Sequence, residues 1–229
     1  MSEEEIFGST VTQLKEMYDR RLREYGDSPQ AAQHTDKENQ ERRLRPVCEV
    51  GDLRKAKILD FGCGLGHALV FLREIFDFQG EYVGYDISPE MVRSASVKHP
   101  DVRFECRNIF SEGLGEDFDY VLISGVFNPL TGDNWEWMTE CLRMLWERTN
   151  VGISFNNLSR YVDFFSEDLY YVDPAQLFRF CKEELSPLIT IRHDYCTKPG
   201  VVPYEFTTYV YRTDIKPRKL NMLGLEDNV

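Results

Sequence analysis

The chain has 229 residues, of which 42% are hydrophobic and 13% aromatic, enough apolar material for one well-packed domain, which argues against global disorder. Its 39 acidic residues outnumber 27 basic ones and give a formal net charge of -12, so phosphate backbones are repelled and a nucleic-acid partner is disfavoured. No segment approaches the roughly 20 apolar residues of a membrane-spanning helix, so no membrane partner is expected either.

The six cysteines are far apart and include no Cys-x-x-Cys pair, so the sequence indicates neither a zinc site nor a disulfide framework. We expect buried free thiols in a reducing cytoplasm, and no metal. The opening sequence MSEEEIFGST is acidic and lacks the apolar core of a secretion signal, which favours a cytoplasmic protein.

The N-terminal segment is predicted to be helical. Apolar and aromatic residues recur at helical spacing, with charged residues between them, at Val11, Leu14, Tyr18, Leu22 and Tyr25. The sequence GDSP at 26–29 ends this helix. Residues 30–45 are very polar, so a helix there is expected to be mostly exposed. We interpret 1–52 as an N-terminal helical segment, 53–215 as the main domain and 216–229 as a tail.

From residue 57, short apolar strands alternate with amphipathic helices. The predicted strands are 57–62, 81–88, 102–106, 118–124 and 151–157, with helices at 67–75, 89–99 and 134–148. Near-continuous apolar strands joined through helices indicate an α/β fold with a parallel sheet covered on both faces. After a helix at 173–185, strands at 188–195 and 204–212 are separated only by a Pro/Gly turn, so one of them must run antiparallel.

A glycine-rich loop follows the first strand. A P-loop requires a Lys-Ser/Thr pair after its last glycine, whereas His67 and Ala68 follow Gly66. A dinucleotide-binding loop requires the spacing G-x-G-x-x-G, whereas Gly62, Gly64 and Gly66 are spaced G-x-G-x-G. The P-loop is therefore excluded, and the dinucleotide interpretation is weakened but stays open.

Two acidic residues at strand ends narrow the choice of ligand. Asp60 ends the first predicted strand, where its carboxylate would repel a diphosphate and attract an ammonium or sulfonium group. Asp86 lies at the end of the next strand, where an acid can accept hydrogen bonds from both ribose hydroxyls. A cationic ligand with a ribose and no phosphate describes S-adenosylmethionine.

The sequences ILDFGCGLGH and YVGYDIS resemble the first two motifs of the class I S-adenosylmethionine-dependent methyltransferases, in particular the compact bacterial enzymes that act on small molecules. FECRNIF and FDYVLIS follow at the intervals found in that family. The resemblance covers roughly residues 57–212. It implies a Rossmann-like, doubly wound and mostly parallel seven-stranded sheet, with a C-terminal antiparallel hairpin and an N-terminal helical lid over the cofactor.

The resemblance also implies which residues bind S-adenosylmethionine: Asp60, Gly62, Cys63, Gly64, Asp86, Ile87, Asn108, Ile109, Ser124 and Gly125. Asp60 belongs at the methionine end, Asp86 at the ribose and Ile87 against the adenine. Asn108 takes a position that often carries an acid bonded to the adenine amino group, and an amide oxygen can accept the same bond. Ser124 and Gly125 are expected beneath the sulfonium.

The acceptor site is less constrained, because methyl transfer needs mainly alignment, exclusion of water and sometimes a base. Our candidate catalytic residues are Asn156, after the fifth strand, Tyr171, and Tyr18 if the first helix folds over the cofactor. Asn128 follows the fourth strand and is a further acceptor-site candidate. Its sequence FNPL does not match the Asn-Pro-Pro-Tyr signature of amino-group methyltransferases, which begins at the strand tip, where this chain has Ser124.

We expect a methyltransferase acting on a small molecule in specialised metabolism, because the sequence contains no recognisable tRNA- or protein-recognition domain. One alternative keeps the cofactor and changes the reaction. A cyclase or aminocarboxypropyl transferase attacks the aminobutyrate chain, releases methylthioadenosine and, in the cyclase, forms azetidine-2-carboxylate. The second alternative is a non-catalytic protein that binds S-adenosylmethionine. The oligomeric state is not set by the sequence.

Overall fold

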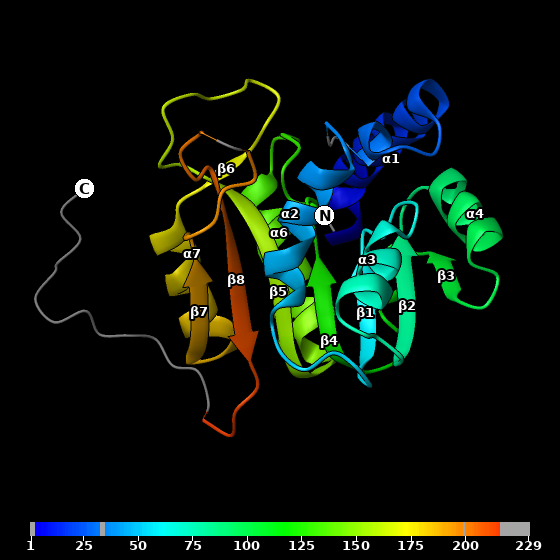
Figure 1. Cartoon of the computed structure of the whole chain (residues 1–229). Coiled ribbons are helices and arrows are strands. Elements are labelled where there is room, and N and C mark those ends of the chain that lie inside the picture. Colours follow the sequence, from blue (N-terminus) through cyan, green and yellow to red (C-terminus); the bar gives the residue numbers. More distant parts are fainter. Residues whose placement is uncertain (1–2, 33–34, 199, 216–229) are drawn as a thin grey trace, which may run out of the picture.

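A central sheet organises the computed structural model, which describes residues 3–32, 35–198 and 200–215 (Figure 1). Its strands are β1 (Lys57–Phe61), β2 (Glu81–Asp86), β3 (Arg103–Cys106), β4 (Phe118–Ile123), β5 (Thr149–Ser159), β6 (Tyr171–Val172), β7 (Leu188–Arg192) and β8 (Glu205–Tyr211). The strand order is β3-β2-β1-β4-β5-β8-β7, and the short β6 pairs with the end of β5.

The strand directions confirm the predicted α/β fold. Strands β1 to β5 are parallel, whereas β8 runs antiparallel to both of its neighbours, β5 and β7. The sequence prediction contained seven strands and omitted β6, which is only two residues long. Because β1, β2, β4 and β5 are parallel, their carboxyl ends lie at one edge of the sheet, the edge at which open α/β sheets bind ligands.

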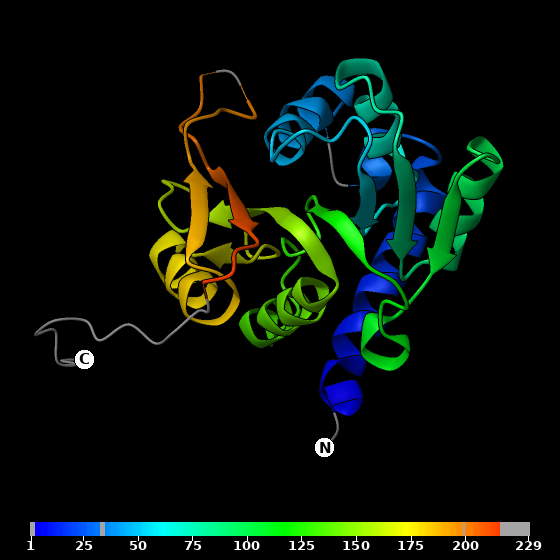
Figure 2. The ribbon, with the colours of Figure 1, turned by 90° about the horizontal axis from the view of Figure 1, so that it is seen from below.

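Helices cover both faces of the sheet (Figure 2). They are α1 (Glu3–Tyr25), α2 (Lys37–Cys48), α3 (His67–Ile75), α4 (Pro89–Lys98), α5 (Ile109–Glu112), α6 (Asn134–Glu147) and α7 (Pro174–Phe180), with a 3₁₀ turn at Pro29–Ala32 and a π turn at Cys181–Leu185. Side chains of α1, α6 and α7 share one apolar core, and those of α2, α3 and α4 share the other. Burial on both faces explains the near-continuous apolar strands.

The helix α2 corrects one expectation. Residues 30–45 were expected to be mostly exposed, but Asn39, Gln40 and Leu44 are buried. Asn39 Nδ2 donates to the Thr197 carbonyl at 3.0 Å, and Gln40 Nε2 lies 3.0 Å from His67 Nδ1. Polar side chains can be buried when such partners are available, so a polar sequence alone did not predict exposure.

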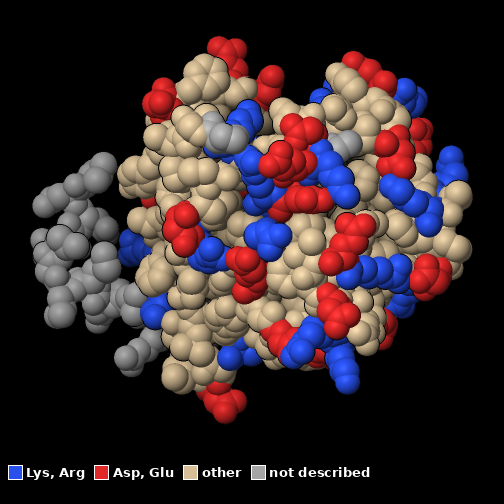
Figure 3. Space-filling view, in the orientation of Figure 1, with Lys and Arg blue, Asp and Glu red and all other residues tan. Residues whose placement is uncertain are grey.

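Two other sequence expectations concern the surface. Cys106 and Cys196 are exposed, contrary to the expectation of buried thiols, whereas the other four cysteines are buried. Across the described ranges, no helix is long and apolar enough to cross a membrane. Acidic and basic side chains are interspersed over the face of the molecule seen in Figure 3.

Candidate functional site

A cavity of about 490 Å³ opens at the carboxyl edge of the sheet, within the size range of small-molecule sites. Its walls come from the glycine-rich loop, the ends of β2 and β4, the helices α1 and α2, and the loops 160–170 and 193–204. Figure 1 shows α1 lying across this end of the sheet. Predicted site residues that line the cavity are Asp60, Gly62, Cys63, Gly64, Asp86, Ile87, Ser124, Gly125, Tyr18 and Tyr171.

The loop after β1 presents bare backbone to the cavity. The N–H groups of Gly62 and Cys63 both donate to the Tyr85 carbonyl, at 2.8 and 3.0 Å, which folds the loop back onto β2. Gly62 has φ +78°, and a Cβ atom at this position would lie only 2.3 Å from Val126 Cγ2. A side chain is therefore excluded for both steric and conformational reasons.

Asp86 is held firmly at the end of β2. Its Oδ2 accepts from Gly64 N at 2.8 Å, and its Oδ1 accepts from Ser88 N at 2.9 Å. Burial raises the pKa of Asp86 above its ordinary value, although these backbone hydrogen bonds favour the charged form. Each carboxylate oxygen keeps a lone pair for a ligand hydroxyl.

Asp60 lies deeper, with only 3% of its surface exposed, and accepts a hydrogen bond from the Tyr82 hydroxyl. Burial raises the pKa of Asp60 to about 7, and the nearby charge of Asp86 adds to the increase. Two carboxylates in one cavity disfavour an anionic ligand and favour a cationic one.

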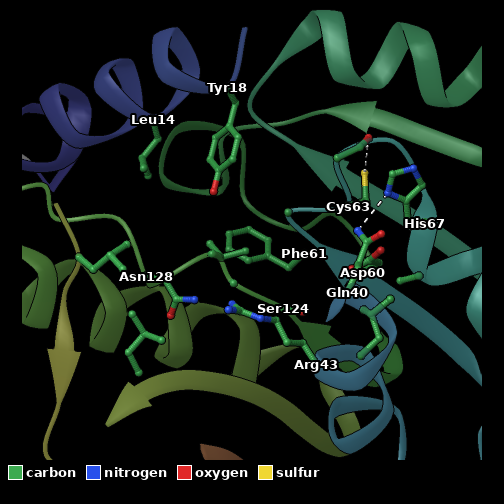
Figure 4. A pocket seen from close by; sticks show the side chains of 18 of the residues that line it. Leu14, Tyr18, Gln40, Arg43, Asp60, Phe61, Cys63, His67, Ser124 and Asn128 are labelled. Atoms are coloured by element: carbon green, nitrogen blue, oxygen red, sulfur yellow. Dashed lines mark hydrogen bonds between the residues drawn. The ribbon is translucent and has the colours of Figure 1, made fainter. Parts of the chain in front are cut away.

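One end of the cavity is closed by polar groups that include a histidine (Figure 4). Gln40 Nε2 lies 3.0 Å from His67 Nδ1, and His67 Nε2 lies 3.3 Å from Asp27 Oδ1. Burial lowers the pKa of His67, which favours a neutral ring that accepts from Gln40 and donates to Asp27. Sequence reasoning missed Gln40, because no local pattern distinguishes it from the surrounding polar residues.

The helix α1 is fixed to the end of β2. Ser88 Oγ donates to Asp19 Oδ1 at 2.5 Å, and both side chains are buried. Tyr18, the residue before Asp19, lines the cavity. Its pKa is raised by burial and by the charge of Asp86. Tyr18 is therefore a neutral phenol next to Asp86.

Asn156 does not line the cavity but lies behind its wall. Its Oδ1 accepts from Gly125 N at 2.7 Å, and its Nδ2 donates to Glu205 Oε1 at 2.8 Å. Glu205 is 1% exposed and pairs with Arg43 of α2, whose Nη1 lies 3.1 Å from Glu205 Oε2. This chain of contacts joins the end of β4 to an N-terminal helix through β5 and β8.

Asn108 and Ile109 also lie outside the cavity lining. Asn108 is the N-cap of α5, and its Oδ1 accepts from Phe110 N at 3.1 Å. Ile109 is buried in the apolar core. On this side the lining instead includes Arg107, which the sequence analysis did not select, and whose guanidinium lies 5.1 Å from the centre of the Tyr85 ring.

The cavity wall formed by α6, the end of β5 and the loops 160–170 and 193–204 is mainly apolar, although Asp163, Ser166 and Lys198 also line it. Its lining there includes Trp137, Leu158, Val162, Leu169, Tyr171, Val201 and Val202. Tyr171 Oη accepts from Ser166 N at 3.0 Å, so its hydroxyl supports the loop 160–170. The site thus has an acidic compartment beside bare glycine backbone and a second, more apolar compartment.

These features fit S-adenosylmethionine. The acidic compartment complements its positive charge, the free lone pairs of Asp86 match ribose hydroxyls, and the glycine backbone leaves room for close approach. The second, more apolar compartment lies beside Ser124 and Gly125, which follow β4 and line the cavity.

Comparisons with known proteins agree with this interpretation. A family model described as "Methyltransferase domain" matches residues 58–147. The putative methyltransferase Rv1506c of Mycobacterium tuberculosis is 38% identical over 159 residues, which cover 67% of this chain and 91% of that protein.

Solved structures share the fold at low sequence identity. Magnesium protoporphyrin IX methyltransferase from Synechocystis, with bound S-adenosylhomocysteine, has a TM-score of 0.62 and 17% identity over 89% of this chain and 99% of its own. The plantazolicin methyltransferase BpumL has a TM-score of 0.58 and 15% identity over 89% of this chain and 98% of its own.

Proposed function

Because this chain belongs to the class I S-adenosylmethionine-dependent methyltransferases, we propose that it methylates a small-molecule acceptor. The observation that carries the proposal is the pair of carboxylates at the ends of β1 and β2, which share one cavity with bare glycine backbone. The magnesium protoporphyrin IX and plantazolicin enzymes are named for acceptors of this kind, which supports an isolated molecule as the substrate.

S-adenosylmethionine supplies a methyl group that its sulfonium activates. In our proposal, Asp86 accepts from the ribose hydroxyls, Ile87 packs against the adenine, and Asp60 contributes negative charge at the methionine end. Tyr18 covers the cavity from α1 and excludes water, so the segment 1–52 acts as a lid. Ser124 and Gly125 form the part of the cavity wall where the sulfonium of the cofactor would face the acceptor.

We place the reaction in the cytoplasm and in specialised metabolism. Six free cysteines support a reducing compartment. The apolar acceptor compartment supports an isolated metabolite, because a macromolecular substrate generally requires an extended recognition surface.

Calorimetry on purified protein tests whether the chain binds S-adenosylmethionine. The same measurement on Asp86→Asn tests whether the cofactor binds at the end of β2. The substitution removes charged acceptors from the ribose, so we expect affinity for S-adenosylmethionine and S-adenosylhomocysteine to fall about 10–100-fold. Asp117→Asn is the matched control, since the Asp117 side chain is 55% exposed and pairs with Arg148. Absence of cofactor binding by the unaltered protein would overturn the proposed function.

Product analysis tests the reaction. The protein is incubated with S-adenosylmethionine, first alone and then with candidate acceptors, and the nucleoside products are identified by mass spectrometry. S-adenosylhomocysteine formed with a methylated acceptor is the expected result. Methylthioadenosine formed faster than without protein would instead assign the cyclase or aminocarboxypropyl chemistry.

A further inference from the structure

Two buried polar side chains that line the cavity lack hydrogen-bond partners. Asn128 is 5% exposed and Trp137 is 4% exposed. Among the described residues, Asn128 Oδ1 has no donor and Trp137 Nε1 has no acceptor. A buried polar atom without a partner is costly, and most such atoms in folded proteins are paired. Two unpaired atoms on the lining of one cavity therefore point to a ligand that pairs with both.

The two side chains belong to segments that are tied together. Asn128 lies in the loop after β4, and Trp137 lies in α6. Asn134, one turn before Trp137 on the same helix, donates through its Nδ2 to the Pro129 carbonyl at 2.7 Å. The carbonyl of Asn128 itself accepts from Tyr170 N at 2.8 Å. The fold thus holds both residues on one wall, and Figure 4 shows the Asn128 amide directed into the cavity.

The two unpaired atoms need opposite partners. An amide oxygen only accepts a hydrogen bond, and an indole N–H only donates one. A ligand group that completes both must carry a donor for Asn128 and an acceptor for Trp137. A carboxylate or an ionised hydroxyl has no donor for Asn128 Oδ1, and an ammonium group has no acceptor for Trp137 Nε1. The pair therefore selects an uncharged group with both functions.

The charged side chains on this side of the cavity also leave room for an uncharged group. Arg43 lines the cavity, but its Nη1 lies 3.1 Å from Oε2 of the buried Glu205, so its charge is compensated within the protein. Asp163 and Lys198 line the cavity too, and they are exposed and of opposite sign. Water and salt screen exposed charges. No buried charge on this side therefore requires a counterion from the ligand.

We propose that Asn128 and Trp137 recognise a cyclic amide of the methyl acceptor, whose N–H donates to Asn128 Oδ1 and whose carbonyl accepts from Trp137 Nε1. The inference rests on the proposed methyltransferase function and names its acceptor class: a cyclic amide on an apolar body. Because both side chains lie on one wall, the amide must present its N–H and its carbonyl on one edge. An open-chain amide is trans and points them in opposite directions, whereas a small ring holds the amide cis.

A cyclic amide also fits better than a hydroxyl. An amide carries its donor and its acceptor on different atoms, so each can meet one of the two side chains. A single hydroxyl oxygen would have to lie within hydrogen-bond distance of Asn128 and of Trp137 at once.

The apolar body follows from the other residues of the lining. Leu158, Val162 and Leu169 line the cavity. Phe164, which is 75% exposed, and Val202, which is 51% exposed, line it as well. A ring system held there would cover apolar surface that is otherwise exposed to water.

Two probes that differ in one ring atom test the inference. 1H-Quinolin-2-one is a cyclic amide fused to a benzene ring, and coumarin has an oxygen in place of its N–H. Each is titrated by calorimetry into the unaltered protein saturated with S-adenosylhomocysteine. Coumarin cannot donate, and its ring oxygen would place a lone pair against Asn128 Oδ1. We therefore expect the quinolone to bind about tenfold more tightly or better.

Substitutions separate the two contacts. Asn128→Leu removes the acceptor, so the quinolone should bind within about threefold of coumarin. Trp137→Phe keeps an aromatic ring but removes the indole N–H. Both probes use their carbonyl, so both should bind about 3–10-fold more weakly to this variant. Trp135→Phe is the matched control and should change neither affinity, since Trp135 lies on the same helix, packs against the Phe180 ring and is outside the described lining of the cavity.

Equal binding of the two probes to the unaltered protein, or no binding of the quinolone at about 1 mM, overturns the inference. An unchanged preference for the quinolone in Asn128→Leu, or unchanged probe binding in Trp137→Phe, also overturns it. So does an equal loss of quinolone and S-adenosylhomocysteine affinity in Asn128→Leu, because the amide would then serve the cofactor. If Asn128→Leu does not fold, the probe pair on the unaltered protein and Trp137→Phe still decide. Failure of the unaltered protein to bind S-adenosylhomocysteine would refute the proposed function itself, whereas the outcomes above leave that function standing.

Discussion

Both polar atoms of the Asn156 side chain form hydrogen bonds. Its Oδ1 accepts from Gly125 N, and its Nδ2 donates to Glu205. The sequence analysis proposed Asn156 as a catalytic residue because it follows the fifth strand. In the structure it is fully buried behind the cavity wall, and it contacts the backbone that shapes the end of β4. We therefore expect Asn156 to act as a positioning residue that keeps Gly125 in place.

Substitution Asn156→Ala separates positioning from catalysis. It leaves Gly125 N and a Glu205 oxygen without their partner, so we expect the free energy of unfolding to fall by about 2–4 kcal/mol. Urea unfolding measures this loss, with Asn150→Ala as the exposed control. In a residual folded sample we also expect cofactor affinity to fall, since Gly125 lines the cavity. Unchanged stability together with a lower kcat alone would restore the catalytic interpretation.

Some site residues could be predicted from the sequence around them, and others could not. Asp60 and Asp86 could be predicted because each lies at the end of a strand, and parallel strands bring their carboxyl ends together. Arg43 and Gln40 could not be placed in the same way. Their role depends on Glu205 and His67, which are distant in sequence, and on a helix whose polar composition resembles that of an exposed one.

At the scale of elements, a buried polar contact joins α1 to the residue that caps α4 just after β2, in addition to the apolar packing of α1 in the core. Ser88 Oγ donates to Asp19 of α1 and also accepts from Met91 N as the N-cap of α4. One hydroxyl therefore stabilises two helices. Amphipathic spacing predicted α1 itself, but not where it docks, because the docking depends on a partner in a different part of the chain.

Substitution Ser88→Ala should loosen α1 over the cavity. Asp19 loses its hydroxyl partner and α4 loses its cap, and we expect a loss of about 2–3 kcal/mol in the free energy of unfolding. Hydrogen exchange followed by mass spectrometry should show at least tenfold faster exchange in residues 3–25. Ser94→Ala is the control, because Ser94 Oγ donates only to the Glu90 carbonyl of its own helix. Protection of α1 equal to that of the unaltered protein would show that the contact does not hold the helix.

At the scale of the whole molecule, the acidic cavity makes stability depend on pH. Asp60 has a pKa of about 7 in the folded chain and an ordinary value of 3.8. Between these values the folded state binds more protons than the unfolded state, so the free energy of unfolding falls as pH rises through this window. Asp86 contributes in the same direction, because its pKa is also raised.

Urea unfolding at pH 5 and pH 8 tests this dependence with Asp60→Asn. The unaltered protein should lose stability between the two values, by up to about 3 kcal/mol from Asp60 alone, since about two pH units of the interval lie below its folded pKa. Asp60→Asn should lose less, because an amide does not titrate. Affinity for S-adenosylmethionine should rise over the same interval, as Asp60 becomes charged. Identical pH dependence in both proteins would exclude Asp60 as its source.

The position of β8 has a consequence for synthesis on the ribosome. It is the last described strand in the chain, yet it lies between β5 and β7 in the sheet and carries Glu205, the partner of Arg43. A nascent chain that has emerged only as far as β7 therefore presents β5 as an open edge, to which other growing chains can add. The glycine-rich loop and both carboxylates have emerged by then, whereas Val201, Val202 and Tyr204 of the cavity wall emerge only after β7.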